Sequence, residues 1–322
     1  MKMLKYVIKR LILMLFVFFA VATICFVLIR LIPRELPMDK NQAQALQLRW
    51  EALGYNKPLL TQYGIYLKNI FTEFDFGTSW YLQFNKPALD LLLNSLLPTV
   101  LVNAYSLIFS IPLGILLGIY AAVKKNKWQD TLISTGVMVF VSVPSYVYAF
   151  LVQYFLYFKL DLFEKPFILS LADAGGSYFT WAMFKSMIMP ILALSFGEIA
   201  GLCRFTRAEL TETLTSDYML LARTKGLTRG QATARHALKN AMVPILPMLI
   251  GSFISVMSGS MIIERIFSIP GVGDLYINAI RQFDYDVFMV DSLFYSFVGL
   301  LAGIVVDLSY GFIDPRIRMG EK

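Results

Sequence analysis

The run LILMLFVFFAVATICFVLI, from Leu11 to Ile29, contains no charged residue. A helix needs about 20 mostly apolar residues to cross the hydrocarbon core of a bilayer, where no water satisfies its backbone groups. Four basic residues within the first ten positions precede the run, and Ala20-Val21-Ala22 resembles a signal-peptide cleavage site. However, the apolar residues continue to Ile29, which is too long for an ordinary signal core. We therefore expect an uncleaved first membrane span.

Five further segments repeat this pattern. They are Leu91–Val123, Thr131–Phe158, Ser186–Cys203, Asn240–Ile263 and Val287–Ile313. Leu91–Val123 is longer than one span requires, so its first part has room for a tilted or surface helix, and Pro144 predicts a kink in the third span. The chain is 57% hydrophobic and only 16% charged, whereas soluble domains carry about 25% charged residues. The sequence predicts an all-α integral membrane protein with about six transmembrane helices.

The basic residues alternate between sides of this predicted bundle. They gather in the first ten residues, in Lys124–Lys127, in Arg204–Asn240 and in the tail 314–322. Connections rich in Lys and Arg lie in the cytoplasm, whereas the neutral or acidic connections 33–90, 159–185 and 264–286 are expected outside. Both termini are then cytoplasmic, in the cell membrane. The net charge of +7 is interpreted as this topology signal rather than as nucleic-acid binding.

The predicted domains follow from this alternation. Residues 1–32 form the N-terminus and first helix, 33–90 an extracytoplasmic segment, 91–313 a five-helix core that includes 204–240, and 314–322 a cytoplasmic tail. The outer segment is too long for a bare loop, so we expect a small helical cap whose many aromatic residues anchor it at the membrane surface. Cys25 and Cys203 are expected to be apolar fillers rather than a disulfide.

The connection Arg204–Asn240 carries seven basic residues against three acids and becomes amphipathic. Ser216 or Thr215 is placed to cap a short helix that begins at Asp217, and Gly226 followed by Leu227 is placed to end it. Thr228 and Gln231 have the spacing of a capping box, which begins a second helix. A short helix of this kind fits a cleft on a soluble partner and transmits rigid-body motion. A solvated loop with a favourable charge remains the alternative, and spacing does not decide between them.

Several motifs of this chain resemble one transporter family. Asp217–Leu227, with His236–Ala241 and Pro244, is similar to the coupling motif of type I binding-protein-dependent ABC importer permeases. The similarity is greatest to the first (B-type) permease of the oligopeptide/dipeptide/nickel subfamily. Other matching segments are Phe76–Ser79, Leu97–Thr99, Ser142–Ser145, Arg204–Arg207, Glu264, Phe267, Pro270–Gly273, Asp307-Leu308 and Asp314–Arg318. Two positions depart from the pattern, because Lys239 and Asp286 stand where family members often have proline.

The resemblance implies a division of labour among subunits. A second homologous permease would complete the pathway, two ATP-binding subunits would dock from the cytoplasm, and an extracytoplasmic binding protein would deliver peptides. ATP and magnesium are expected in those partners, and no cofactor is expected in this chain. The residues implied to couple to the ATP-binding subunits are Ser216, Asp217, Tyr218, Leu221, Ala222, Arg223, Lys225, Gly226 and Leu227.

Acids within spans are expensive and are functional candidates. Glu198 is expected to pair with Arg204 or Arg207, and Asp307 to take part in a structural pairing near Asp314 and Arg316. Asp291 is a candidate for lining the outer entrance, with simple hydration as the alternative. The turn that contains Pro270, Gly271 and Gly273 is a candidate outer gate or vestibule, or an ordinary turn.

Motifs for catalysis are missing from the sequence. It has no Gly-x-x-x-x-Gly-Lys-Ser/Thr phosphate loop and no Gly-x-Ser-x-Gly elbow, and the single histidine, His236, excludes a multi-histidine metal site. We therefore expect a transport subunit rather than an enzyme or a membrane protease. Nickel or another small solute is the alternative cargo within the family, and an ion-coupled secondary transporter is the alternative outside it.

Overall fold

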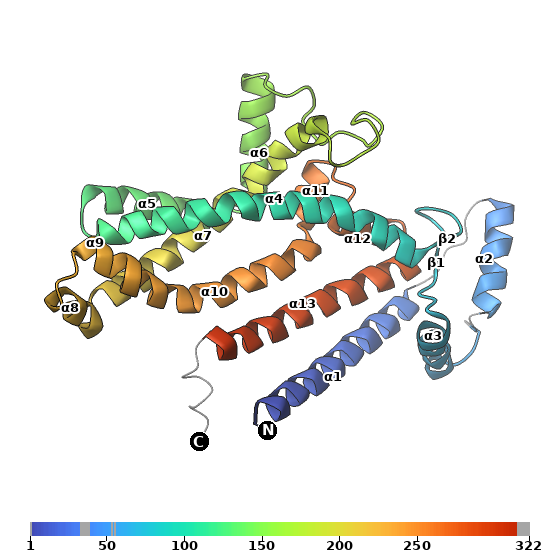
Figure 1. Cartoon of the computed structure of the whole chain (residues 1–322). Helices are drawn as coiled ribbons and strands as arrows, with labels where there is room; N and C mark the ends of the chain where they lie inside the picture. Colours follow the sequence, from blue (N-terminus) through green and yellow to red (C-terminus); the bar gives the residue numbers. More distant parts are fainter. Residues whose placement is uncertain (1, 33–38, 53, 55, 314–322) are drawn as a thin grey trace. The chain divides into compact units, whose positions relative to one another are not determined.

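The computed structural model describes residues 2–32, 39–52, 54 and 56–313, and almost all of its regular structure is helical (Figure 1). The chain divides into two compact units. Unit 1 comprises Met1–Thr99, Ser258–Met261 and Pro270–Leu301, and unit 2 comprises Val100–Met257, Ile262–Ile269 and Ala302–Lys322. The predicted tail 314–322, with the Asp314–Arg318 motif and the expected partners of Asp307, lies outside the described residues.

Five of the six predicted spans are confirmed as helices long and apolar enough to cross a membrane. They are α1 (Lys2–Leu31), α4 (Ala88–Val123), α7 (Trp181–Leu214), α10 (Leu238–Ser255) and α13 (Tyr285–Ile313). The helix α10 continues from α9 (Arg229–Ala232) and the π-helix η2 (Thr233–Ala237), and the 3-10 turn η3 (Val256–Ser258) follows it. The predicted fifth span is therefore interrupted before Ile263, which belongs to the separate helix α11 (Met261–Ile266).

The third predicted span differs most from expectation. It consists of α5 (Trp128–Ser142), α6 (Ser145–Val152) and the π-helix η1 (Gln153–Lys159), and the chain bends by 101° between α5 and the α6–η1 helix. Figure 1 shows α6 leaving the direction of α5. The predicted kink at Pro144 is in the right place, but the structure makes it a break. Val143 is extended (φ −92°, ψ 126°) because the residue before a proline disfavours helical geometry.

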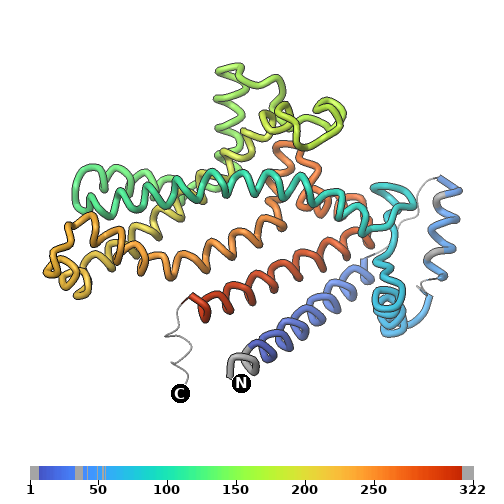
Figure 2. The backbone as a smooth tube through the Cα atoms, viewed as in Figure 1, coloured from blue at the N-terminus to red at the C-terminus, as the bar shows by residue number. Residues whose placement is uncertain are grey.

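Unit 2 is organised around α7. Figure 2 follows the chain as it reverses after α4 at Lys124–Lys127 and returns along α5. Gly114 and Gly118 of α4 face α7 so closely that a Cβ atom on Gly118 would lie 2.6 Å from Cβ of Thr206. At Gly114 the same atom would lie 2.7 Å from Cβ of Leu202. This Gly-x-x-x-Gly spacing is the pattern by which membrane helices approach closely.

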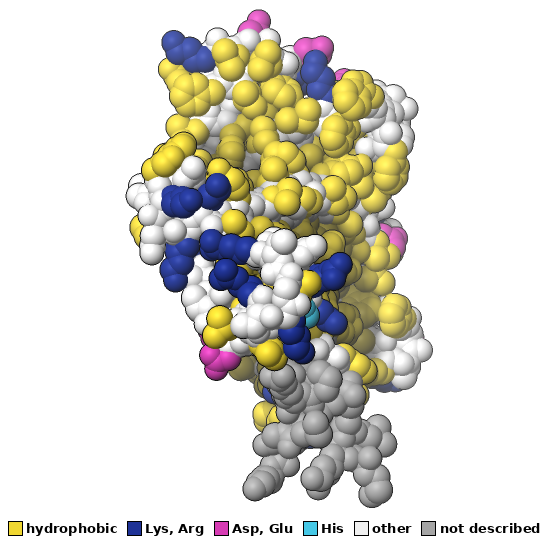
Figure 3. Space-filling view, turned by 60° about the vertical axis from the view of Figure 1, so that its left-hand side comes forward, with side chains coloured by type: hydrophobic (Ala, Val, Ile, Leu, Met, Phe, Trp, Pro, Cys, Tyr) yellow, Lys and Arg dark blue, Asp and Glu magenta, His cyan; other side chains and the backbone are white. Residues whose placement is uncertain are grey.

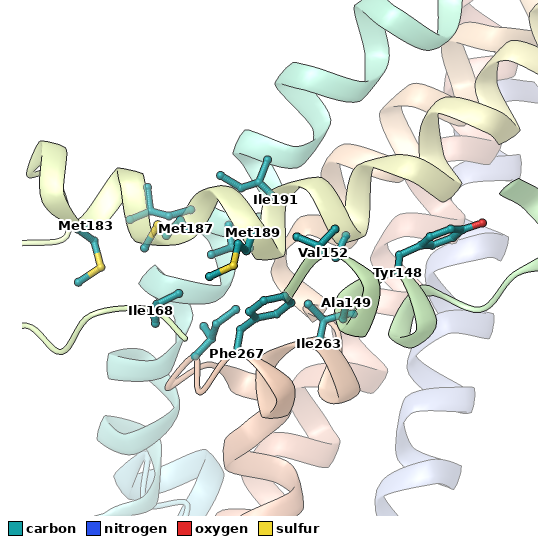
Figure 4. Close-up of a cluster of buried hydrophobic side chains, with 14 of the residues drawn as sticks. Tyr148, Ala149, Val152, Ile168, Met183, Met187, Met189, Ile191, Ile263 and Phe267 are labelled. Carbon is teal, nitrogen blue, oxygen red and sulfur yellow. The ribbon is translucent and has the colours of Figure 1, made fainter. Parts of the chain in front are cut away.

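The largest buried cluster of unit 2 lies where α6, α7 and α11 meet (Figure 4). Methionines 183, 187 and 189 of α7 belong to this cluster together with Ile263 and Phe267, and Met189 lies above Phe267 in Figure 4. Methionine side chains fill irregular spaces well, which suits a junction of one long helix with two short ones. Ile168, from the connection between η1 and α7, also belongs to the cluster, and its N–H donates to the carbonyl of Phe267 at 3.0 Å.

Unit 1 contains the outer segment. The prediction of a helical cap is confirmed in part, since α2 (Lys40–Ala52) and α3 (Leu59–Glu73) are helices. The small hairpin β1 (Thr78–Ser79) and β2 (Lys86–Pro87) was not predicted. The rings of Tyr63 and Tyr66 each lie 5.1 Å from the ring of Phe26 in α1. These two aromatic residues therefore pack α3 on α1 instead of serving as free membrane anchors.

The hairpin is held by a carboxylate that precedes α13. Oδ2 of Asp284 accepts four hydrogen bonds from one short stretch of the chain. The donors are the hydroxyl of Ser79 at 2.6 Å and the N–H groups of Trp80, Tyr81 and Leu82 at 3.2, 3.1 and 3.0 Å. Asp286 also accepts from the N–H of Thr78 at 3.1 Å. The departure from proline at Asp286 thus supplies a second attachment of the hairpin to α13.

Candidate coupling site

The short helix predicted in the basic connection is α8 (Asp217–Thr224). Ser216 occupies the N-cap position, as predicted, but its side chain does not cap the helix. Its hydroxyl donates instead to the carbonyl of Thr213, at 2.6 Å. The hydroxyl therefore satisfies an acceptor in the last turn of α7, so Ser216 joins two helix ends rather than capping one.

The C-terminal end of α8 follows the prediction closely. Gly226 has φ +89°, a left-handed conformation that glycine adopts without steric cost. Its N–H donates to the carbonyl of Arg223 at 3.0 Å, and the N–H of Leu227 donates to the carbonyl of Ala222 at 3.3 Å. These two bonds form a Schellman motif. The roles of Gly226 and Leu227 in ending the helix are therefore confirmed.

The second predicted helix begins as expected. Thr228 Oγ1 accepts from the N–H of Gln231 at 3.3 Å, and the N–H of Thr228 donates to Oε1 of Gln231 at 3.0 Å. This reciprocal pair is a capping box. The N-cap Thr228 lies two positions after Gly226, so α9 follows α8 across a short corner held by the hydrogen bonds at both helix ends.

One face of α8 is fastened to the ends of long helices. Met219 and Ala222 are buried in a cluster of small and apolar side chains, and Leu227 packs against it. The cluster also contains Ala122 of α4, Leu210 of α7, Ala232 of α9, Ala237 of η2 and Ala241 of α10. The alanines let these elements approach closely. A displacement of α8 would therefore be passed to α4, α7 and α10 together.

The remainder of α8 is exposed and carries three large apolar side chains among polar and charged ones. Leu220 is 64% exposed, Leu221 is 55% exposed, and Tyr218 is exposed beside them. Of the other predicted coupling residues, Asp217, Arg223, Lys225 and Gly226 are exposed, whereas Ala222 is buried. Figure 3 shows Lys and Arg side chains gathered around this end of the molecule. Exposed leucines rimmed by charge are typical of a protein-binding surface.

A partly buried ion pair joins α5 and α7. Nη2 of Arg207 in α7 donates to Oδ2 of Asp130 in α5 at 2.7 Å, and Nε donates to the other oxygen. The N–H of Asn126 and the hydroxyl of Ser134 also donate to Asp130. No sequence pattern predicted this pair, because its members lie 77 positions apart.

The predicted pairing of Glu198 with Arg204 or Arg207 is wrong. Arg207 is engaged by Asp130, and Oε1 of Glu198 accepts from the hydroxyl of Ser252 at 3.1 Å. The physical reason is the face of α7 on which each residue lies. Glu198 points toward α10, whereas Arg207 points toward α5. The acid within the span thus connects two helices through a neutral partner.

The candidate outer residues lie in unit 1 and differ in exposure. Pro270 is exposed, whereas Gly271 and Gly273 are buried at the start of α12 (Val272–Arg281). The N–H of Val272 donates to Oγ1 of Thr99 at 2.9 Å, which fixes this turn. Asp291 is completely buried in this chain, and its role at the outer entrance stays a prediction. The role of the turn as a gate stays a prediction.

The described residues include no group of three His, Cys, Asp or Glu side chains placed to hold a metal ion. Outside the membrane, one exposed ion pair lies in the connection before α7. Nζ of Lys165 donates to Asp173 at 2.8 Å, and this hydrogen bond lowers the pKa of the Asp173 carboxyl. It lies on the border of a cavity of about 370 Å³.

Comparison with known proteins assigns the fold to one family. Residues 114–319 match the family described as "Binding-protein-dependent transport system inner membrane component", and residues 3–91 match the N-terminal region of such components. The chain is 34% identical to the dipeptide transport system permease protein DppB of Lactococcus lactis, over 98% of this chain and all of the relative. It is 32% identical to DppB of Bacillus subtilis, over 99% of this chain and all of the relative. Identity is also 32% to the glutathione transport system permease protein GsiC of Shigella flexneri, over 98% of this chain and 99% of the relative.

Proposed function

This chain belongs to the family of binding-protein-dependent transport system inner membrane components, and from that membership we propose that it is one permease of an ATP-driven peptide importer. The chain itself is a multi-pass membrane permease, a transport component. Peptides are proposed as the cargo because the relatives named above carry dipeptide and glutathione in their names.

The proposed assembly places this chain beside a second permease, with two ATP-binding subunits below and an extracytoplasmic binding protein above. ATP and magnesium are held by the ATP-binding subunits. Both termini of this chain face the cytoplasm, as does α8. The exposed face of α8, which we call the coupling face and define as Tyr218, Leu220 and Leu221, docks into a groove on one ATP-binding subunit.

The observation that carries this proposal is the two-faced construction of α8. Its coupling face exposes leucines in a basic, non-spanning segment, where burial by a protein is the favourable outcome. Its inner face is fixed to the ends of α4, α7 and α10. A helix built in this way transfers a movement of the docked subunit to the membrane helices as a rigid body.

A substitution on the coupling face tests the proposal. Leu221→Glu places a charge on an already exposed position, so the chain is expected to fold and insert normally. The ATP-binding subunits should then be lost on purification, and peptide uptake should fall by about tenfold or more, since a desolvated carboxylate opposes docking. Leu60→Glu is the matched control, because Leu60 is 85% exposed in α3 of unit 1. Unchanged subunit recovery and uptake in Leu221→Glu would contradict the assigned coupling face.

Purification of the intact complex tests the wider assignment. The chain should be recovered with a second permease and ATP-binding subunits, and reconstituted vesicles should accumulate a labelled dipeptide only when ATP is present. Nickel accumulation without dipeptide accumulation would correct the cargo but keep the family mechanism. Uptake by this chain alone, driven by an ion gradient, would overturn the mechanism.

A further inference from the structure

The break between α5 and α6 lies at the depth of the membrane interior. The helix α5 has 15 residues, so it is about 22 Å long at 1.5 Å per residue. It begins directly after Lys124–Lys127, which the charge pattern places at the cytoplasmic surface. The hydrocarbon core is about 30 Å thick. A helix that starts at one surface and stops after about 22 Å ends inside that core.

Contacts within unit 2 agree with this depth. The ring of Phe140, in the last turn of α5, stacks on the ring of Phe196 at 5.6 Å. Phe196 lies near the middle of α7, which has 34 residues. The break is therefore level with the central part of a long span rather than with either of its ends.

Backbone groups at the break are left open to the surroundings. Pro144 is the N-cap of α6 and provides no side-chain cap. In the part of the chain that the structure describes, the N–H groups of Ser145 and Tyr146 have no hydrogen-bond partner. The side chains of Ser142 and Ser145 are exposed. Part of the break is satisfied internally. The hydroxyls of Tyr148 and Ser142 donate to the carbonyls of Phe140 and Met138, each at 2.8 Å, and the N–H of Val147 donates to the carbonyl of Pro144 at 3.0 Å.

Lipid does not provide a suitable environment for such a break. Hydrocarbon has no hydrogen-bonding groups, so irregular backbone at membrane depth occurs only where protein buries it or where it lines a water-filled cavity. Exposed serine hydroxyls beside unpaired N–H groups favour the second case. The whole run Thr131–Phe158 is uncharged, so the break would offer hydrogen bonds to a passing molecule without fixing it by a strong charge.

We propose that the break at Ser142–Ser145 lines the water-filled translocation pathway and hydrogen-bonds the main chain of the peptide in transit. This inference rests on the proposed function and deepens it by naming residues that contact the cargo. Backbone N–H groups and hydroxyls recognise the amide groups that all peptides share. A surface of this kind holds peptides irrespective of their side chains, as an importer of varied peptides requires.

Thiol labelling of the whole complex in open membrane fragments tests the inference. Cys25 and Cys203, the two native cysteines, are first replaced by alanine. Single cysteines are then introduced as Ser142→Cys, Ser145→Cys and, as the control, Ile108→Cys. Ile108 is 64% exposed near the middle of the unbroken helix α4, so it represents an exposed apolar position on a regular helix.

A charged, water-soluble thiol reagent should modify the Ser142→Cys and Ser145→Cys variants at least about tenfold faster than the Ile108→Cys control, because only a watered site supports thiolate formation. Excess dipeptide should slow the reaction at both positions and leave the control unchanged. Reaction as slow as the control would overturn the inference, whether lipid or a second permease covers the break. Peptide uptake in the same membranes reports separately on the proposed function, so uptake with unreactive cysteines would overturn this inference alone.

Discussion

The Asp130–Arg207 pair shows how much of the site depends on single side chains. The Asp130 side chain is only 5% exposed and accepts hydrogen bonds from two nitrogens of the Arg207 guanidinium, Nε and Nη2. Arg207→Ala leaves a buried carboxylate without its cation, which costs about 3 kcal/mol. Arg207→Lys should recover little of this, because an ammonium does not reproduce two parallel hydrogen bonds. The melting temperature of the purified complex measures both variants.

Arg204 is the natural control for that prediction. It lies in the same motif, one turn before Arg207, but its side chain is exposed. Arg204→Ala is therefore expected to change the melting temperature little. Equal destabilisation by the two alanine variants would show that charge in this segment, rather than the pair with Asp130, supports α5 against α7.

Gly226 is required by its backbone conformation. Proline at this position would need φ near about −65° instead of +89° and would lose the N–H that bonds to Arg223. Gly226→Pro should leave insertion intact but misdirect the corner between α8 and α9, so that ATP hydrolysis continues while peptide uptake falls. Asp217→Arg, which alters the first turn of α8, is expected to have the same effect. Gly230→Ala is the control, because Gly230 has open space around it.

Parallel assays of ATP hydrolysis and peptide uptake on the purified complex in vesicles measure this uncoupling. A ratio of peptide molecules to ATP that stays at the wild-type value in Gly226→Pro would count against α8 as the coupling helix. A parallel loss of both activities would point to lost docking rather than to lost transmission.

Asp284 organises the hairpin of unit 1. Asp284→Ala leaves one hydroxyl and three N–H groups without their acceptor, and we expect a loss of more than about 3 kcal/mol. Limited proteolysis should detect new cleavage near Trp80–Leu82 in this variant. Asp90→Ala serves as the comparison, since Asp90 is exposed. Equal protease resistance in both variants would mean that the four hydrogen bonds contribute little.

At the scale of elements, close packing of α4 on α7 gives a sharper test than any cap. Gly118→Ala introduces a Cβ atom 2.6 Å from Cβ of Thr206 and 2.8 Å from the carbonyl oxygen of Cys203. The second contact is with backbone, which cannot turn away, so we expect about 1–3 kcal/mol of destabilisation. Gly136→Ala in α5 meets nothing within 4 Å and should be neutral or slightly stabilising, because alanine is the better helix former.

Heat treatment of the solubilised complex, followed by size-exclusion chromatography, compares these two glycine variants directly. If Gly136→Ala destabilises the complex as much as Gly118→Ala, then the loss of glycine itself, rather than the α4–α7 contact, is responsible.

What the sequence predicted among the elements was local. The caps at Gly226 and Thr228 depend on residues within five positions of each other, and a chain segment specifies such bonds by itself. The hydrogen bonds from the hairpin to Asp284 join residues more than 200 positions apart. The ion pair between Asp130 and Arg207 joins residues 77 positions apart. Such contacts depend on which helices pack together. One sequence without relatives carries no record of that pairing, so the ion pair was missed and Glu198 was paired wrongly.

The break at Pro144 depends on both local sequence and contacts between distant residues. Its ring and missing N–H predict an interruption, and the interruption is where it was expected. The size of the bend, 101°, was beyond prediction. The angle depends on how α6 packs against α7 and α11 in the methionine-rich cluster. These contacts are between residues far apart in the sequence.

For the whole molecule, the bend between α5 and α6 determines how many times the chain crosses the membrane. Among the described residues, five helices are long and apolar enough to cross the membrane, and the bent pair of α5 and α6–η1 makes a sixth if it forms one span. An odd number of crossings would place the two termini on opposite sides. The span α7 has 34 residues, which gives a length of about 51 Å, so it crosses fully by itself. Its C-terminal end leads into the basic segment, so its start at Trp181 is expected outside.

Labelling from each side of the membrane tests this topology. Ala172→Cys, exposed in the connection before α7, should react with an impermeant reagent in intact cells. Lys125→Cys, exposed at the turn after α4, should react only after the membrane is opened. A fluorescent protein fused after Lys322 should be cytoplasmic. If Ala172→Cys reacts only in opened cells, α5 and α6 form a re-entrant loop, and the alternation of charges has misplaced every element that follows Lys159.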